Sequence, residues 1–268
     1  VTVYEKDEYP GGLLRFGIPN FKLQKTVIDR RIKVMQAEGI TFKTNTPVDV
    51  EKLPAGYDAY CICTGTPTAR DLKVPGRDLK GVHFALELLS QQNRVLAGQT
   101  FSANERVTAK GKRVLVIGGG DTGSDCIGTS HRQGAVSVTQ IEIMPKPPVG
   151  SNPNTPWPQW PVVLKTSSSH EEGCERRWLL TTNKFIGTKD NRVCGAEVEE
   201  VEWKPNPDGG RPIMVPTGKK ETIECDIVFL AMGFLRPEQP KFAENVFVAG
   251  DAATGASLVV RCIAGGRK

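Results

Sequence analysis

The stretch that decides the fold is KRVLVIGGGDTGSDCIGTSHRQGAVSVTQIEIMP, residues 112–145. Its apolar run at 114–117 is typical of a buried strand, and the glycines of 118–123 follow at the spacing G-x-G-x-x-G. The next segment has the pattern of a helix that closes at Gly134, and a second strand is expected from about 136 to 144. The pattern predicts a βαβ unit with a right-handed crossover.

Glycines at this spacing have separate roles in a dinucleotide-binding turn. The first makes the tight turn, the second lets the backbone approach a pyrophosphate, and the third lets the helix pack on the strand. The phosphates then lie at the positive end of the helix. The strand, turn and helix context favours a dinucleotide site over a purely structural turn, and its residues are Gly118, Gly119, Gly120, Asp121, Thr122 and Gly123.

The residues leave open which nicotinamide dinucleotide would bind. An acid at the end of the second strand favours NAD, and a basic residue there favours NADP. Glu142 lies on this strand, two residues before its expected end. Arg132, His131 and Lys146 are candidate partners of a 2′-phosphate, and each is equally consistent with a solvated charge.

The two ends of the chain have the pattern of a second nucleotide-binding unit. A strand at 1–4 ends on the acid Glu5, where such a unit contacts a ribose, and a helix at 21–39 and strands at 40–45 and 57–65 follow. The last of these is almost continuously apolar, as expected of a strand covered on both faces. At 246–255 a strand ends in Gly250-Asp251, which by itself fits a helix cap as well as a flavin site. Together with Glu5 and the end of the 57–65 strand, it favours a flavin site.

The domain organisation follows from these two patterns. We expect an α/β protein with two Rossmann-like domains, the second inserted in the first, and an antiparallel β-meander from residue 193. The FAD-binding domain would comprise residues 1–105 and 240–268, and the NAD(P)H-binding domain residues 106–239. The first domain lacks its first glycine turn and the chain lacks a start methionine, so we expect a fragment.

Composition narrows the functional classes. Of the 268 residues 24% are charged and the net charge is +5, with no block of five like charges, so no nucleic-acid partner is expected. No apolar run approaches the ~20 residues that cross a bilayer, so no membrane partner is expected. The seven cysteines are scattered and include no C-x-x-C, which favours free thiols in the cytoplasm over a disulfide frame or a cluster-ligand run.

Taken together, these motifs resemble the small (beta) subunit family of glutamate synthase, within the two-dinucleotide-binding-domain flavoproteins. The resemblance covers almost the whole chain and is carried by EKDEYPGGLLRFGIPNFKL, ICTGTPTARDLKVPG, VLVIGGGDTGSDCIGTSHRQGA, EIMPKPP, NPNTPWPQWP, TSSSHEEGCERRW and AGDAATGASLVVR. The SSSHEEG segment and the WPxWP run are specific to this family rather than to flavin oxidoreductases in general.

The resemblance implies an NAD(P)H-dependent FAD oxidoreductase. Hydride would pass from NADPH, with NADH possible, to FAD. Electrons would then leave through iron–sulfur clusters, held only in an N-terminal region that these residues do not include, toward the large (alpha) subunit that forms glutamate. Cofactors carry this chemistry, so no catalytic acid or base is expected.

The resemblance also implies the cofactor contacts. Along FAD these are Glu5 at the ribose, Gly11, Gly12 and Leu13 at the flavin's approach, Thr64 and Gly65 at the phosphates, Gly250 and Asp251 at the ribityl-phosphate chain, and Ser257, Leu258 and Val259 beside the isoalloxazine ring. The glycine turn would cradle the NADPH pyrophosphate, and Gly233 and Phe234 would lie beside the nicotinamide half.

The chain departs from the family pattern at three places. The first glycine turn and the cysteine-rich domain are missing, so these residues alone are expected to bind FAD poorly. The segment from Gly233 to Gly250 is shorter than in the family, as if residues were deleted. Ile143 and Met144 stand where many relatives have paired arginines, which leaves NADPH over NADH open.

Several residues outside these motifs have two interpretations. His170 with Glu171 and Glu172 could hold a metal, but a turn or helix start is favoured. Cys61 and Cys63 alternate along a strand and are expected to be core thiols.

The tryptophans and the overall function also leave alternatives. Trp157, Trp160 and Trp178 could stack on a nicotinamide or anchor a partner subunit. Other functions that fit are a related NAD(P)H:acceptor flavoprotein, of the ferredoxin:NADP or pyrimidine-reducing type, and a non-catalytic remnant.

Overall fold

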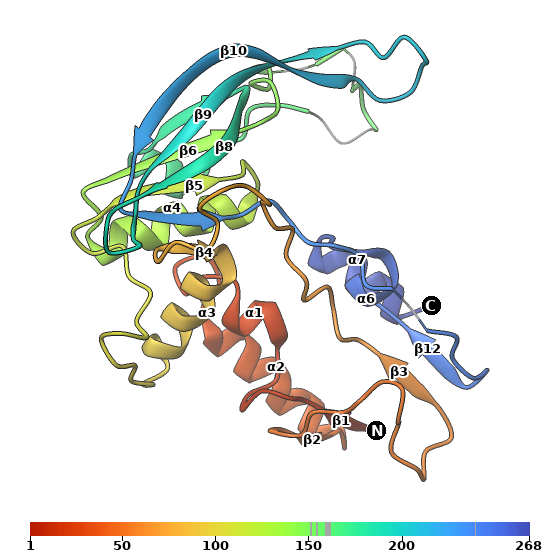
Figure 1. The fold of residues 1–268 in the computed structure, drawn as a ribbon. Helices are drawn as coiled ribbons and strands as arrows, with labels where there is room; N and C mark the ends of the chain where they lie inside the picture. The colour runs from red at the N-terminus through yellow and green to blue at the C-terminus, as the bar shows by residue number, and fades with distance from the viewer. Residues whose placement is uncertain (151, 154, 159–161, 239) are drawn as a thin grey trace. The chain divides into compact units, whose positions relative to one another are not determined.

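The computed structural model describes residues 1–150, 152–153, 155–158, 162–238 and 240–268. The chain divides into two compact units, one formed by Val1–Arg70 with Gly233–Lys268 and one formed by Asp71–Met232. Figure 1 shows the first unit in red to orange and in blue, because it contains both ends of the chain. The predicted insertion of one unit in the other is therefore confirmed.

The core of the second unit is a sheet of five parallel strands. Its order is β4 (Val82–Phe84), β11 (Ile227–Leu230), β5 (Arg113–Ile117), β6 (Ser137–Glu142) and β7 (Glu175–Trp178). The predicted βαβ unit is β5, α4 (Asp121–Gln133) and β6. Pairing of β4 with β11 draws residues 71–105 into this unit, so the expected boundary at 105 differs from the observed division after Arg70.

Both faces of this sheet are covered, in line with the apolar runs of its central strands. On one face, Val114 and Val116 of β5 pack with α3 (Ala85–Leu96) and α4. On the other, Leu115 and Ile117 pack with a three-stranded antiparallel sheet, drawn above β5 and β6 in Figure 1. Alternation along β5 thus places the sheet between helices and a second sheet.

The antiparallel sheet is the predicted meander. Its strands are β8 (Leu180–Gly187), β9 (Val193–Lys204) and β10 (Ile213–Glu224), in the order β10-β9-β8. The sequence pattern identified β9 and β10 but neither β8 nor the edge strand β7. A short helix, α5 (Ser168–Glu171), precedes β7.

The first unit contains two separate parallel pairs of strands. One pair is β1 (Thr2–Tyr4) with β2 (Thr41–Lys43), and the other is β3 (Tyr60–Ile62) with β12 (Val246–Val248). Its helices are α1 (Gly12–Phe16), α2 (Lys25–Ala37), α6 (Asp251–Thr254) and α7 (Val259–Gly266). The helix expected from residue 21 begins later, at Lys25, and α6 and α7 are separated at Gly255, whose φ is 86°.

Strand β3 corrects one expectation. Its apolar sequence predicted burial on both faces and core thiols, but Cys61 and Cys63 are both exposed. In the described part of the chain β3 belongs to a two-stranded sheet with β12, and Phe247, the register partner of Cys61, is itself 59% exposed, so this part of the sheet is not covered on both faces.

Candidate functional site

The glycine turn between β5 and α4 admits no side chain at two positions. Gly118 has a φ of 124°, and a Cβ there would lie 2.2 Å from the carbonyl oxygen of Ala231. A Cβ on Gly123 would lie 2.3 Å from the carbonyl oxygen of Gly118. Backbone atoms cannot yield by that much, so these glycines are required for the turn to pack against the end of β11 and the start of α4.

The N-terminus of α4 faces open space. Its N-cap is Gly120, which makes no side-chain capping bond, and a Cβ on Gly120 would meet nothing within 4 Å. A helix of 13 residues carries partial positive charge at this end, and uncapped N–H groups of its first turn suit an anion. The turn therefore fits the pyrophosphate of a dinucleotide.

Glu142 lies against this turn. Strand β6 ends at Glu142 itself, not two residues later as expected. Its carboxylate accepts hydrogen bonds from the backbone N–H groups of Gly119, of Ile143 at 2.9 Å and of Met144 at 3.3 Å. The three donors fix an acid at the strand end beside Gly119.

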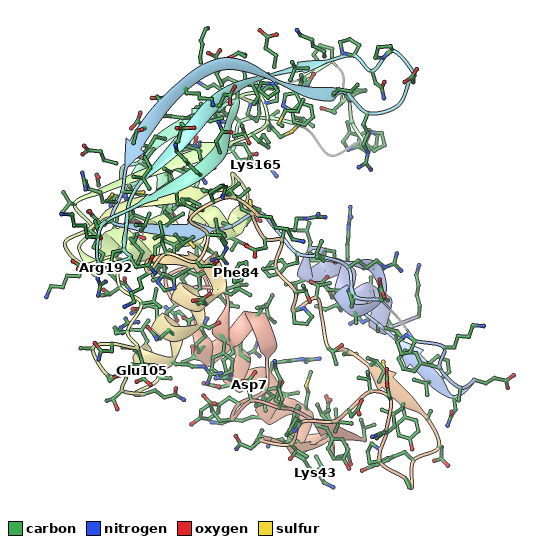
Figure 2. The ribbon with its side chains drawn as sticks, viewed as in Figure 1. Asp7, Lys43, Phe84, Glu105, Lys165 and Arg192 are labelled. Carbon is green, nitrogen blue, oxygen red and sulfur yellow. The ribbon has the colours of Figure 1, made fainter. Side chains whose placement is uncertain are left out.

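A cavity of about 230 Å³ opens at the carboxyl ends of β6 and β7. Lys165, labelled in Figure 2, lines it from the segment before α5, together with Gly119 and Glu142. Arg176 and Trp178 line it from β7. Ligands of parallel sheets bind outside the carboxyl ends of the strands, and this cavity lies at such a place.

The cationic groups around the cavity are held by neighbours. Arg176 donates to the carbonyl of Lys165 at 3.1 Å, and its guanidinium lies 5.2 Å from the centroid of the Trp178 ring. Burial lowers the pKa of Arg176. The Nζ of Lys146 lies 5.1 Å from the same ring. Of the tryptophans considered as stacking groups, Trp178 is thus at the cavity, Trp157 is 92% exposed, and Trp160 lies outside the described residues.

A chain of polar side chains braces the glycine turn from behind. The Nε2 of Gln140 donates to the carbonyl of Gly118 at 2.9 Å, and its Oε1 lies 3.2 Å from Nε2 of His170. The Nδ1 of His170 lies 3.0 Å from the Ser167 hydroxyl, which in turn lies 2.5 Å from that of Ser124 in α4. The sequence analysis found SSSHEEG to be specific to the family but assigned it no role. In the structure, Ser167 and His170 of this segment support the glycine turn.

The favoured interpretation of His170, Glu171 and Glu172 as a helix start is confirmed. Ser167 caps α5 and His170 completes the capping box. Glu172 forms an ion pair with Arg132. The described residues contain no group of three or more His, Cys, Asp or Glu side chains placed to hold a metal ion.

The last turn of α4 carries two of the candidate 2′-phosphate partners away from the glycine turn. Arg132 pairs with Glu172 and donates to the carbonyl of Gly128 at 3.0 Å, and His131 contacts the carbonyl of Gly173. Eleven residues of helix separate Arg132 from Asp121, about 16 Å at 1.5 Å per residue. The helix therefore does not bring Arg132 or His131 to the turn.

In the first unit, the predicted FAD contacts lie at the ends of strands and the starts of helices. Glu5 follows β1 and accepts from the N–H of Asp7 at 3.0 Å, and Gly11, Gly12 and Leu13 begin α1. Thr64 and Gly65 follow β3. Gly233 and Phe234, expected beside the nicotinamide, are the first residues of the returning part of this unit, and Phe234 forms a β-bridge with Ala69.

The second half of this predicted site surrounds Asp251. Its carboxylate accepts from the Ser257 hydroxyl at 2.8 Å and from the Cys262 thiol at 3.1 Å. Gly250, with a φ of 66°, precedes α6, and Leu258 and Val259 begin α7. Because β1–β2 and β3–β12 are separate sheets, no sheet within the described residues joins Glu5 to Gly250, and the fit to FAD is partial.

Comparisons with known proteins extend this geometry. The pyridine nucleotide-disulphide oxidoreductase family matches residues 22–153. A glutamate synthase [NADPH] small chain of Mycobacterium tuberculosis is 43% identical over all of this chain and 60% of its own length. A putative glutamate synthase [NADPH] small chain of Cereibacter sphaeroides is 32% identical over all of this chain and 68% of its own length.

The chain belongs to the glutamate synthase small-chain family. It spans about 60% of the length of the M. tuberculosis small chain. That match extends over 297 aligned positions against 268 residues here, so the relative carries residues within the match that this chain lacks. A glutamate synthase [NADH] of Saccharomyces cerevisiae is 36% identical over all of this chain and 14% of its own length, so the small-chain family resembles proteins named for either nucleotide.

Solved structures agree with the fold. M. tuberculosis FprA in complex with NADPH matches with a TM-score of 0.71 at 17% identity, over 97% of this chain and 73% of that chain. The thioredoxin reductase of T. acidophilum matches with a TM-score of 0.63 at 18% identity, over 99% of this chain and 86% of that chain. Because both identities are below 25%, these two matches show that this chain shares the fold of the two proteins, and nothing more.

Among the residues that the structure describes, every helix is too short or too polar to cross a bilayer.

Proposed function

We propose that this chain is part of an electron-input flavoprotein subunit of glutamate synthase, which takes hydride from NAD(P)H. The observation that carries the proposal is the tight glycine turn before the open end of α4, in a chain 43% identical to a glutamate synthase small chain. When bound, the nicotinamide and flavin cofactors supply the redox chemistry, and the protein supplies binding and orientation.

The second unit would bind the nicotinamide dinucleotide. The N–H groups at the start of α4 hold the pyrophosphate, and Gly118 and Gly123 keep the backbone close enough for that contact. The cavity beside Glu142 takes one end of the molecule, since about 230 Å³ is below the ~300–1,000 Å³ typical of whole small-molecule sites. Gly233 and Phe234, which come directly after this unit along the chain, would contribute to the nicotinamide end.

The first unit would contribute to the FAD site. Glu5 accepts a hydrogen bond from the ribose, and Gly250 and Asp251 approach the ribityl-phosphate chain at the start of α6. Thr64 and Gly65 flank the phosphates after β3. Support comes from the position of each residue at a strand end or helix start, where backbone N–H groups are available.

The subunit would pass electrons to iron–sulfur clusters outside these residues and on to the large subunit. The family of the relatives supports this partner. All seven cysteines are free thiols, which supports a reducing compartment such as the cytoplasm.

Reconstitution tests the proposal. The full-length protein carrying this chain is purified with its flavin, mixed with the large subunit, and supplied with 2-oxoglutarate, glutamine and NADH or NADPH. We expect glutamate only when both subunits are present, and flavin bleaching by NAD(P)H with the small subunit alone.

Two results would contradict the proposal. Flavin reduction without any glutamate formation with the large subunit would favour a related NAD(P)H:acceptor flavoprotein. Binding of neither NADH nor NADPH at millimolar concentration would favour a non-catalytic remnant.

A further inference from the structure

The position of Glu142 relates directly to nucleotide choice. It is the last residue of β6, the strand that follows the glycine turn and its helix. An acid at this place in a βαβ unit accepts a hydrogen bond from the 2′-hydroxyl of the adenosine ribose, which only the non-phosphorylated dinucleotide has. The Glu142 carboxylate also lines the cavity with Gly119 of the turn.

The Glu142 carboxylate is held in one orientation and can still accept a further hydrogen bond. Backbone N–H groups of Gly119, Ile143 and Met144 donate to it, two of them to Oε1 and one to Oε2. A carboxylate offers about four acceptor sites, so one hydroxyl donor can still be accommodated. Since all three donors belong to the backbone, the orientation does not depend on a mobile side chain.

A 2′-phosphate would meet like charge at this place. The two residues that follow Glu142 are Ile143 and Met144, and neither can offset a second negative charge. Two negative groups at contact distance repel, and specificity against a competing ligand is often built from such a repulsive contact.

The basic side chains that line the cavity are engaged elsewhere or set back from the strand end. Arg177 forms an ion pair with Glu221 of β10. Arg176 is paired in register with Gln140, two residues before Glu142, which is about 7 Å back along the strand. Its guanidinium and the Trp178 ring present flat groups suited to a base.

Two lysines complete the basic groups near the cavity. The Nζ of Lys146 lies 5.1 Å from the centroid of the Trp178 ring, and Lys165 lines the cavity from the segment before α5. Glu142 is the charged group that the backbone holds directly against the glycine turn.

We propose that Glu142 is a specificity-determining residue and that this site selects NADH over NADPH. The inference rests on the proposed function, because it takes the glycine turn to bind a nicotinamide dinucleotide, and it adds which of the two is preferred.

Calorimetric titration of the flavin-loaded full-length protein with NAD⁺ and NADP⁺ tests the inference, with kcat/KM for NADH and NADPH as a second readout. We expect NAD⁺ to bind at least tenfold more tightly. Glu142→Gln should lower the ratio of the two affinities at least tenfold, by weakening NAD⁺ and strengthening NADP⁺. Met144→Arg, at a half-exposed position that lines the cavity, should strengthen NADP⁺ with Glu142 in place.

Glu175→Gln is the matched control. The substitution makes the same change, from a carboxylate to an amide, on the neighbouring strand β7, where Glu175 pairs in register with Thr139. Glu175 is exposed and does not line the cavity. It should leave the affinity ratio unchanged.

The outcomes separate the inference from the proposed function. Tighter binding of NADP⁺ by the unaltered protein, or an affinity ratio that neither Glu142→Gln nor Met144→Arg changes, overturns the inference and leaves the proposed function standing. Binding of neither nucleotide overturns the proposed function and the inference with it.

Discussion

Gln140 holds the carbonyl of Gly118 with a 2.9 Å hydrogen bond from its side-chain amide. Gln140 is only 2% exposed, and its other amide atom lies 3.2 Å from His170. The same Gly118 carbonyl is the atom that a Cβ on Gly123 would strike. The shape of the glycine turn is thus set from the neighbouring strand as well as by its own glycines.

Replacing Gln140 tests this support. Gln140→Leu removes the donor to the part-buried Gly118 carbonyl and the contact to Nε2 of His170, which keeps its contact with Ser167, so we expect the free energy of unfolding to fall by about 1–3 kcal/mol. The affinity for a nicotinamide dinucleotide should fall as well, because the turn loses its brace. Urea unfolding and nucleotide titration measure the two effects.

Thr139→Val is the control for this change. Thr139 is the adjacent residue on β6, and its hydroxyl makes one long contact of 3.5 Å to Glu175. We expect a change below about 0.5 kcal/mol, as for substitutions away from buried networks. Equal losses for the two variants would mean that the Gln140 bond contributes nothing particular to the turn.

Two glycines of the turn should respond to alanine in opposite ways. Gly118→Ala places a Cβ 2.2 Å from a backbone oxygen, on a residue whose φ is 124°. The free energy of unfolding should therefore fall by more than about 3 kcal/mol. At Gly120, with a φ of −81° and nothing within 4 Å of a Cβ, alanine should leave the thermal midpoint unchanged. It should nevertheless weaken dinucleotide binding at least tenfold, because its methyl group occupies the space that the pyrophosphate needs.

Thermal unfolding and nucleotide titration of both variants provide the check. Undiminished nucleotide affinity in a folded Gly120→Ala protein would show that the phosphates lie elsewhere.

Local patterns predicted the elements that are specified by neighbouring residues. Strand β5, the turn and α4 are one continuous signal, and Gly134, with a φ of 85°, ends the helix where the sequence placed its end. Strand β11 is an unbroken apolar run, IVFL, and all four of its residues are buried because both of its faces are covered.

Features that depend on distant partners could not be predicted in this way. Strand β7 has the sequence ERRW and is a strand only because it pairs with β6, and β4 has three residues, too few for any periodicity. To place Arg132 one needs the length of α4, and to place Glu142 at a strand end one needs the last residue of β6. The ends of helices and strands are uncertain by a few residues when they are predicted from sequence.

The ion pair of Arg113 with Asp226 predicts a pH dependence. Arg113 donates to both carboxylate oxygens, at 3.0 and 2.7 Å, and its backbone N–H donates at 2.9 Å. The side-chain hydrogen bond from Arg113 is the main reason that the pKa of Asp226 lies below its ordinary value in the folded protein. The pair joins the starts of β5 and β11.

Asp226→Asn should therefore destabilise the protein by about 0.5–1 kcal/mol at pH 7, a small effect because the carboxylate is 39% exposed and solvent screens the pair. A lowered folded-state pKa contributes stability above the unfolded value, near pH 4, that is lost as the pH falls through the folded value. The difference between the two proteins in urea midpoint should thus shrink below about pH 4.

Asp208→Asn, in an exposed turn between β9 and β10, provides a control with the same change of charge. A difference for Asp226→Asn that grows as the pH falls from 4 to 3 would contradict the assigned sign.

Two buried cysteines report on opposite faces of the central sheet. Cys126 of α4 is packed on the helix face and Cys225 on the meander face, and both are fully buried. Burial raises the pKa of both thiols, that of Cys225 to about 12. Since the thiolate is the reactive form, neither should be alkylated by iodoacetamide at pH 7.5 in the native protein, whereas the exposed Cys61 should react.

Alkylation at increasing urea, resolved by peptide mass spectrometry, then tests whether the three layers unfold together. Strands β5 and β11 contribute side chains to both cores, so losing one face exposes the backbone pairing that supports the other. We expect Cys126 and Cys225 to become reactive at the same urea midpoint, as in a cooperative transition. Reaction of Cys225 at clearly lower urea would mean that the antiparallel sheet opens while the helices remain packed, and that the unit contains two cooperative parts.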